Sequence, residues 1–476
     1  MVKFRSLSPR FRLTLILVAA GSAALGGALA PRSGVNASVT AQVAGAGVRL
    51  VYLCADPTAR CSVPEEFGRA ITDHLPIEAS GVLGLTGFDP IYLSGFPATL
   101  VLSDGKPVGA IVGSRADDIL REEMGALAAA AAAGRLPTRE SLLRSQVVAT
   151  PAGNAALLLE IRYEGGRFVV EGVSQISGQA PARERDSLES YIVQVRDAQG
   201  QVIESRPWQL NRFVSPPPPR PGQDPGGMVE RTAFETAIVL PLYAEAASVQ
   251  ILEPYGVERL SIAVGAPEMR VARDANSKLG ATGVYITGPD SERFTVLFLG
   301  DKYDDDDATF ASDVDIHAGK FLATKPIKSK KNRNNINIYR GDLGKRLKCK
   351  YGCLGIDRLI CCNDAKVFAA AAKSGVAYDE IVVLLNKAKY GGSGGTYAVA
   401  YNRSGKNRWG PEVTVHEAGH SMFGLMDEHE YDINGVPFGP NCSLPPCTWK
   451  GKGLGCWDGC SYLGLARPTD EHCLMR

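Results

Sequence analysis

Apolar and polar residues alternate along the middle of the chain, between about residues 147 and 265. Runs such as ALLLEIRYEG at 156–165 and RFVVEGVSQIS at 167–177 place apolar side chains at or near every second position, the period of a half-buried strand. Glycine-containing turn signals separate the runs, for example at 164–166 and 197–200. This pattern predicts an antiparallel β-sandwich over residues 147–265.

The two flanking segments have a different pattern, in which strand-like runs are mixed with helix-like runs. Residues 46–140 contain an apolar strand run at 48–54, a helix-like stretch at 62–75, a hairpin pattern turning at 103–105, and a helical run ending in six alanines. Residues 283–476 alternate apolar strands with helices. Both segments are predicted to be α/β, so the fold class is multidomain α/β plus β.

Two glycine- or proline-rich stretches interrupt these patterns. SPPPPRPGQDPGG at 215–227 is predicted to be a long mobile loop inside the sandwich, with a partner-binding polyproline II segment as the less favoured alternative. The glycine loop Tyr390–Gly395 precedes the strand-like run TYAVAY. It is either a flexible connection or the start of an edge strand that pairs with an extended substrate. The candidate substrate-strand residues are Gly391, Gly392, Ser393, Gly394 and Gly395.

The N-terminus indicates export from the cytoplasm. Four basic residues precede the uncharged run Leu13–Ala30, which has small residues near its end, the layout of a secretory signal. Residues 1–45 are therefore interpreted as a signal peptide or membrane anchor with a linker. The protein is expected to be secreted, periplasmic or anchored at the outer face of the membrane, with membrane contact only through this segment. With 52 Lys plus Arg against 51 Asp plus Glu, net charge indicates no nucleic-acid partner.

Eleven cysteines agree with an oxidising compartment. Nine of them lie between Cys349 and Cys473, and Cys54 and Cys61 form a separate local group. Such density favours disulfides, with eight of the nine C-terminal cysteines paired. A zinc knuckle built from Cys349, Cys353, Cys361 and Cys362 is the alternative, although regular C-x2-C spacing is missing.

The sequence PEVTVHEAGHSMFGLMDEHEY contains H-E-x-x-H. On a helix, His416 and His420 stand one turn apart on one face, so both imidazoles reach one ion. Glu417 lies within reach of a metal-bound water and is suited to accept its proton. This arrangement predicts Zn²⁺ as the cofactor. A helix with a chance pair of exposed histidines is the alternative.

Further ligand candidates follow Gly424, which is expected to end the helix. The zinc peptidases called metzincins use H-E-x-x-H-x-x-G-x-x-H, and here the residue three beyond the glycine is Asp427. Asp427 is the predicted third ligand and His429 the alternative, with Glu428 expected to hold the turn. Met475 is the candidate for the methionine-containing turn beneath the metal of those enzymes.

Several short motifs occur together in one order: FLGDKY at 298–303, YGGSGG at 390–395, HEAGHSMFGLMDEHEY at 416–431, PNC at 440–442 and ARPTDEHCLMR at the end. Over residues 283–476 they resemble the IgA-protease-type metallopeptidases, metallopeptidase family sixty-four. The resemblance implies a metzincin-like zinc endopeptidase fold, with His416 and His420 as zinc ligands, Glu417 as general base and Asp427 as the matching aspartate. His429 is an insertion relative to the family's D-E-Y.

The N-terminal segment is similar to the thioredoxin fold. The resemblance rests on Gly95-Phe-Pro97 before a hairpin and on Cys54 and Cys61 near the end of the first strand. The cysteine spacing is C-x6-C rather than the C-x-x-C that redox chemistry uses, so a plain disulfide is expected. Residues 46–140 are therefore predicted to be thioredoxin-like and redox-silent.

Together these patterns predict an exported zinc endopeptidase that acts on proteins or peptides. The alternative from another class is a cell-surface binding protein with a structural or inactive zinc site. Glu417 separates the two, because a structural zinc site needs no carboxylate at that position. The sequence leaves the substrate and the oligomeric state undetermined.

Overall fold

The structure is a computed structural model of the 476-residue chain. It describes residues 48–53, 77–80, 98–104, 106–113, 115–134, 136–182, 186–210, 212–220, 222–223, 227–264, 270–271, 280–341, 347–402, 409–429, 440–442, 447, 449, 454–460, 462–469 and 473–475. The export segment, Cys54, Cys61 and Pro97 lie outside these residues. Among the described residues, no helix is long and apolar enough to cross a membrane.

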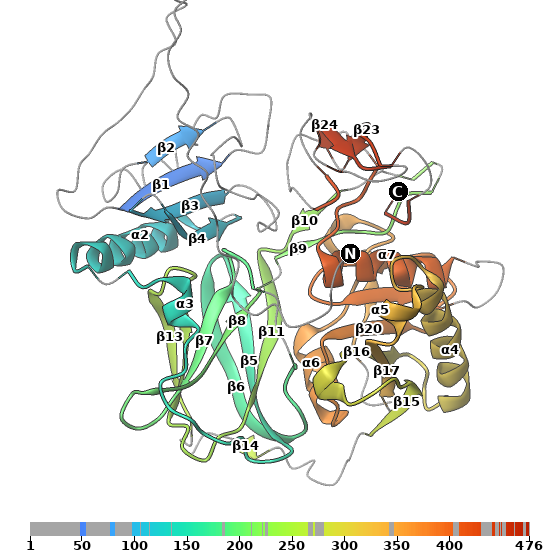
Figure 1. Cartoon of the computed structure of the whole chain (residues 1–476), viewed down its shortest axis with the longest axis horizontal. Coiled ribbons are helices and arrows are strands. Elements are labelled where there is room, and N and C mark those ends of the chain that lie inside the picture. Colours follow the sequence, from blue (N-terminus) through green and yellow to red (C-terminus); the bar gives the residue numbers. More distant parts are fainter. Residues whose placement is uncertain are drawn as a thin grey trace, which may run out of the picture.

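The N-terminal part is a four-stranded mixed sheet with a helix packed on it (Figure 1). The strand order is β2 (Ile77–Ser80), β1 (Val48–Leu53), β3 (Ala98–Ser103), β4 (Lys106–Val112), and only β1 and β2 run parallel. The predicted hairpin turns at Asp104, where φ is 49°. The predicted alanine-rich helix is α2 (Asp117–Ala132), which buries Leu120, Met124 and Leu127 against the sheet. A thioredoxin-like identity for this part remains a prediction.

The alternating middle segment forms two facing four-stranded sheets (Figure 1). One has the order β11 (Ala233–Pro241), β5 (Ala155–Glu164), β6 (Arg167–Ser177), β14 (Arg270–Val271); the other has β13 (Glu258–Ala263), β12 (Ser248–Leu252), β7 (Tyr191–Arg196), β8 (Val202–Trp208). Their inner faces share one apolar core that includes Leu159, Tyr163, Val193 and Val249. All the strand pairs are antiparallel, as predicted, except the short parallel pair β14–β6.

The third segment is built on a six-stranded sheet. Its order is β15 (Ala281–Tyr285), β17 (Ile336–Gly341), β16 (Phe294–Asp301), β20 (Glu380–Leu385), β22 (Ala398–Tyr401), β21 (Gly392–Ser393). The four central strands run parallel, and both edge strands are antiparallel to their neighbours. Because its central strands are buried on both faces, they are continuous apolar runs such as EIVVLL in β20.

Three helices cover this sheet: α4 (Asp307–Ala323), α6 (Asp364–Lys373) and α7 (Gly410–Phe423). Helix α4 lies against α7, where the buried His317 imidazole and the Thr414 hydroxyl are 2.6 Å apart. The remaining short elements are α3 (Arg139–Leu142), α5 (Lys330–Arg333), β9 (Phe213–Val214), β10 (Val229–Glu230), β18 (Lys350–Tyr351), β19 (Ile360–Cys361), β23 (Trp457–Cys460), β24 (Tyr462–Arg467) and two 3-10 turns, Asp290–Glu292 and Cys353–Gly355.

Helix α6 joins the third segment to the sandwich. Its Ala365 and Ala372 pack on Leu158 and Val239, which lie on the outer face of the β11–β5–β6 sheet. Strand β5 is therefore covered on both faces, which explains why its sequence is a continuous ALLL run rather than a strict alternation. The two parts share a hydrophobic core at this contact.

The N-terminal part is joined to the sandwich by buried charges. Glu123 on α2 lies 3.4 Å from Arg115 and 3.2 Å from Arg259 of β13, and Arg259 lies 3.2 Å from Glu253.

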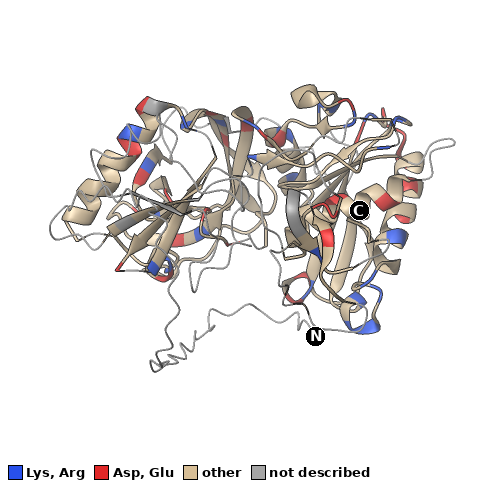
Figure 2. Ribbon diagram, turned by 90° about the horizontal axis from the view of Figure 1, so that it is seen from above, with Lys and Arg blue, Asp and Glu red and all other residues tan. Residues whose placement is uncertain are grey.

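Lysine and arginine residues are interspersed with aspartate and glutamate over both halves of the molecule (Figure 2). No single charge sign dominates either half.

Candidate metal centre

The predicted metal-binding helix is α7. Pro411 lies in its first turn, and Gly424 ends it in the left-handed conformation at φ 60°, where its N–H bonds to the His420 carbonyl at 2.9 Å. Residues 410, 411 and 413–420 are buried. The ring centroids of His416 and His420 lie 4.8 Å apart, and their Nε2 atoms lie 3.2 Å apart. Both histidines therefore face one point, as the i, i+4 spacing predicted.

Asp427 completes a group of three possible ligands. Its Oδ1 lies 3.0 Å from Nε2 of His416 and 3.4 Å from Nε2 of His420, and one ligand atom from each residue lies within 4.8 Å of the others. Among the described residues, this is the group of three His, Cys, Asp or Glu side chains with metal-binding geometry. Burial opposes ionisation of Asp427, but His420 and His416 outweigh it and hold its pKa well below the ordinary range.

The other ring nitrogens of both histidines are fixed by backbone carbonyls. Nδ1 of His416 donates to the Leu474 carbonyl at 2.8 Å, and Nδ1 of His420 donates to the Leu425 carbonyl at 2.6 Å. A proton held at Nδ1 leaves the Nε2 lone pair available to a metal, which is the usual outer support of metal-binding histidines. Two imidazoles and a carboxylate, each offering a lone pair to one point, are a donor set that suits Zn²⁺.

Glu417 is fully buried beside this group. Neither of its carboxylate oxygens has a hydrogen-bond partner among the described residues. Burial, and secondarily the charge of Asp427, raises the pKa of Glu417 well above its ordinary value, while Arg358 opposes the shift. A buried carboxylate without a protein partner is costly unless a ligand completes the site. The position of Glu417 therefore fits a site that a bound ligand would complete.

Met475 lies directly against helix α7. It is 2% exposed, and a Cβ built on Gly419 would lie 2.6 Å from its sulfur atom. A side chain at position 419 would therefore displace the Met475 thioether from this contact. The Met475 carbonyl also accepts a hydrogen bond of 2.5 Å from the Glu428 N–H, which links Met475 to the segment that carries Asp427. The packing is the one expected for a methionine beneath the metal; its assignment as a Met-turn stays a prediction.

The glycine loop lies over the same helix. A Cβ built on Gly392 would lie 2.8 Å from a Glu417 carboxylate oxygen, and one built on Gly394 would lie 2.5 Å from the His420 Cβ. Residues 391–394 are buried, so glycines are required here by close approach. The loop forms edge strand β21, but its outward edge is taken by the protein itself: Gly392 N–H donates to the Arg358 carbonyl at 3.1 Å, and Gly394 pairs with Ser215. Substrate pairing here remains a prediction.

The sequence interpretation missed two residues near the candidate site, Asn441 and Arg358. The Asn441 side chain accepts a hydrogen bond from the Met426 N–H and donates one to the Met426 carbonyl, both at 2.8 Å. Its amide nitrogen also donates to the Glu428 carboxylate at 3.1 Å. Glu428 thus holds the turn, as expected. Asn441 is the central residue of the PNC motif, so the motif was the available signal. Arg358, a buried cation close enough to shift the pKa of Glu417, has no such signal in the sequence.

Four disulfides are present in the C-terminal part: Cys349–Cys362, Cys353–Cys361, Cys442–Cys460 and Cys447–Cys456. Cys473 is the free thiol. The prediction that eight of nine cysteines pair is confirmed, and the zinc-knuckle alternative is wrong because its four cysteines form two of the bonds. The Cys442–Cys460 bond packs against the ligand segment, since both sulfur atoms lie within 3.8 Å of the Asp427 carbonyl oxygen.

Removing the Cys442–Cys460 bond should weaken metal binding. We expect Cys442→Ala/Cys460→Ala to lower zinc affinity by about tenfold or more, because support of a ligand segment is typically worth that much. The matched control is Cys447→Ala/Cys456→Ala, which removes a neighbouring bond with no contact to Asp427 and should cost stability but little affinity. Competitive titration with a chromophoric chelator measures both, and equal losses in the two variants would contradict this role.

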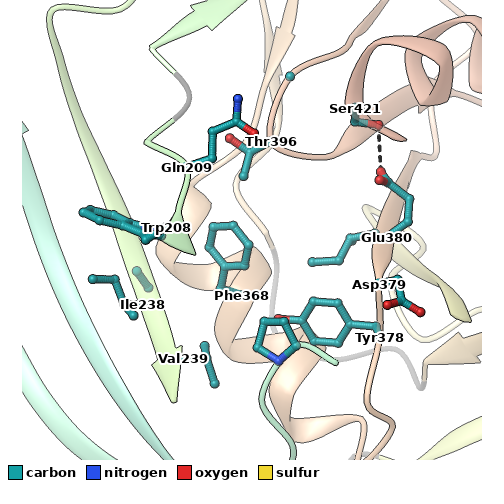
Figure 3. A pocket seen from close by; sticks show the side chains of 14 residues that line it. Trp208, Gln209, Ile238, Val239, Phe368, Tyr378, Asp379, Glu380, Thr396 and Ser421 are labelled. Carbon is teal, nitrogen blue, oxygen red and sulfur yellow. Dashed lines mark hydrogen bonds between the residues drawn. The ribbon is translucent and has the colours of Figure 1, made fainter. Parts of the chain in front are cut away.

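A cavity of about 130 Å³ lies between the sandwich and the third segment (Figure 3). Trp208 of the sandwich and Phe368 of α6 line it, and Gly395 and Thr396 continue the glycine loop into its wall. Ser421, the residue after His420, donates a 2.7 Å hydrogen bond to the buried Glu380 at its edge. Helix α7 is thereby tied to central strand β20.

Residues 283–437 match the model of a family described as IgA Peptidase M64. This match confirms the resemblance to IgA-protease-type metallopeptidases over about a third of the chain, including α7 and Asp427. No curated protein matches the chain significantly. The family match supports a peptidase function for this segment.

Proposed function

We propose that the protein is an exported zinc-dependent endopeptidase whose active site comprises His416, His420, Asp427 and Glu417. The observation that carries the proposal is the convergence of two Nε2 atoms and Oδ1 of Asp427 next to a buried carboxylate that has no hydrogen-bond partner among the residues the structure describes. Three protein ligands leave one coordination position for water and substrate, as in catalytic zinc sites. A purely structural or inactive site, the alternative, gives no reason for Glu417 at the same point.

Zn²⁺ bound by these residues would supply positive charge that lowers the pKa of a bound water and polarises a peptide carbonyl. The protein itself supplies the proton transfers. Glu417 accepts a proton from the attacking water and delivers it to the leaving amine nitrogen, so that the carboxyl group returns to its starting state. The carbonyls of Leu474 and Leu425 keep both imidazoles oriented during the cycle.

The other predicted parts fit this proposal. Four disulfides and the basic, then apolar N-terminus support export into an oxidising compartment. The strand order β2-β1-β3-β4, with a final hairpin and helix, supports a thioredoxin-like N-terminal domain. The expected partner is an extended protein or peptide substrate.

Metal analysis and a chelator test the proposal directly. We expect about one zinc per chain by elemental analysis, and hydrolysis of internal peptide bonds in a peptide library that stops on chelation and returns with added zinc. The positions of cleavage, read by mass spectrometry, identify an endopeptidase. A protein that holds zinc but cleaves nothing in the library would favour the binding-protein alternative.

A further inference from the structure

The segment Ser215–Arg220, here called the strap, leaves the sandwich and lies on the glycine loop of the third segment. The N–H of Ser215 donates to the Gly394 carbonyl at 3.3 Å, and the N–H of Gly394 donates to the Ser215 carbonyl at 3.2 Å. This is an antiparallel bridge on the outward edge of β21. Residues 215–220, the first part of the stretch predicted to be a mobile loop, are therefore held in place by this bridge.

Side chains of the third segment hold the rest of the strap. Arg358 Nε donates to the Pro217 carbonyl at 2.7 Å, and the Tyr390 hydroxyl donates to the Pro218 carbonyl at 2.9 Å. The Arg220 guanidinium lies 4.1 Å from the centre of the Tyr390 ring, a cation–π contact. Residues 215–217 are buried. The carbonyls of Ser215, Pro217 and Pro218 are thus bound by backbone and side-chain donors of the third segment, as the carbonyls of a peptide are bound in a protease cleft.

This contact lies at the candidate active site. Gly394, which pairs with Ser215, is the position where a Cβ would meet the His420 side chain. Arg358, which holds Pro217, also accepts a 3.1 Å hydrogen bond through its carbonyl from the N–H of Gly392, where an added Cβ would lie 2.8 Å from a Glu417 carboxylate oxygen. The Arg358–Leu359 backbone occupies this edge at Gly392, so a substrate strand could add only at Gly394, where it would need the same N–H and C=O that Ser215 now uses. Strap and substrate therefore exclude each other at this edge.

We propose that the strap is an intramolecular occupant of the peptide-binding edge, that it holds the peptidase in a latent state, and that Arg358 and Tyr390 bind the backbone carbonyls of a substrate once the strap has left. The inference rests on the proposed function, because it names a regulation of the same site. Four consecutive prolines suit this role: their φ angles are fixed, so ordering the strap costs little conformational entropy. Tethering adds a high effective concentration, which a free peptide must overcome.

Loosening the strap tests the proposal. Ser215→Pro removes the N–H that donates to Gly394, and Arg220→Ala removes the cation–π contact with Tyr390. Pro219→Ala is the matched control, since Pro219 lies in the same segment without a contact of either kind. The probe is a fluorescent peptide with the sequence of residues 213–220, FVSPPPPR, added to zinc-loaded full-length protein carrying Glu417→Gln. Fluorescence anisotropy then reports binding without any need for turnover.

We expect the Ser215→Pro/Arg220→Ala protein to bind the probe at least about tenfold more tightly than the protein with an unaltered strap does. The Pro219→Ala control should bind the probe like the protein with an unaltered strap. With Glu417 restored, kcat/KM on a quenched fluorescent peptide library should rise by a similar factor. Arg220→Ala alone leaves the backbone unchanged and should give a smaller rise in both, which keeps the test valid if the proline variant does not fold.

The two hypotheses fail in different ways. Stronger probe binding without hydrolysis in any variant would refute the peptidase and leave the strap as an occupant of a peptide site. Hydrolysis that is equal in all folded variants, with equal probe affinity, would overturn the strap proposal and make residues 215–220 a fixed wall of the cleft. A loss of hydrolysis in the loosened variants would overturn it as well.

Discussion

Replacing Glu417 by Gln should abolish nearly all peptide hydrolysis while the protein keeps its zinc. The amide has almost the same shape but cannot accept a proton at neutral pH, and loss of a general base typically costs 10²–10⁴-fold in rate, a range we expect for kcat here. His416, His420 and Asp427 are untouched, so metal content by elemental analysis should remain about one per chain. Burial of a neutral amide in place of a carboxyl group should leave the thermal midpoint unchanged or slightly higher.

The matched control for this substitution lies on the same helix. Glu412 in the first turn of α7 pairs with Lys320 at 2.8 Å and does not line the candidate metal site. Glu412→Gln should therefore retain full turnover. Wild-type activity in Glu417→Gln would falsify the role of Glu417 as general base, whereas equal losses in both variants would point to a disturbed helix.

Replacing Asp427 by Ala should lower zinc affinity by more than about 100-fold and reduce hydrolysis accordingly. Loss of outer support alone costs 10–100-fold in affinity, and removal of a ligand should cost more. It would also leave His416 and His420 as the remaining ligands, too few for a catalytic zinc site. The structure places Oδ1 of Asp427 within 3.4 Å of both Nε2 atoms.

His429→Ala is the discriminating comparison. His429 is partly buried, and desolvation lowers the pKa of its imidazole, which favours the neutral form that binds a metal. We expect this variant to lose less affinity than Asp427→Ala, because the group with metal-binding geometry contains Asp427 in its place. If chelator competition shows that the His429 variant releases zinc and the Asp427 variant retains it, the ligand assignment is wrong.

The helix with the two histidines was predictable because its information is local. A period of 3.6 residues fixes where positions 416, 417 and 420 point, whatever surrounds the helix. The step from Gly424 to Asp427 was also informative, since a left-handed glycine reverses the chain in a repeatable way. The count of paired cysteines followed from the compartment, but their partners did not, because spacing alone does not determine connectivity.

Contacts between segments distant in sequence were not predictable from local pattern. The prolines of the strap indicated an extended backbone, yet nothing near residue 215 points to Gly394 as its partner. Arg358 lies in a short segment closed by the Cys353–Cys361 bond, and its place near Glu417 depends on how that segment folds back. In β5, strict alternation failed because α6, which lies some 200 residues later, covers the second face.

The packing of α6 on the sandwich shows that the segment matched by the family and the part of the chain that packs together differ in extent. The family match begins at residue 283, but the hydrophobic contact of Ala365 and Ala372 with Leu158 and Val239 crosses that boundary. A protein cut at the boundary would present two complementary apolar faces to water, one on each fragment. The unit that carries the sequence resemblance is therefore smaller than the unit that folds, and any recombination of this catalytic segment onto another chain must bring along a surface that replaces the β11–β5–β6 sheet.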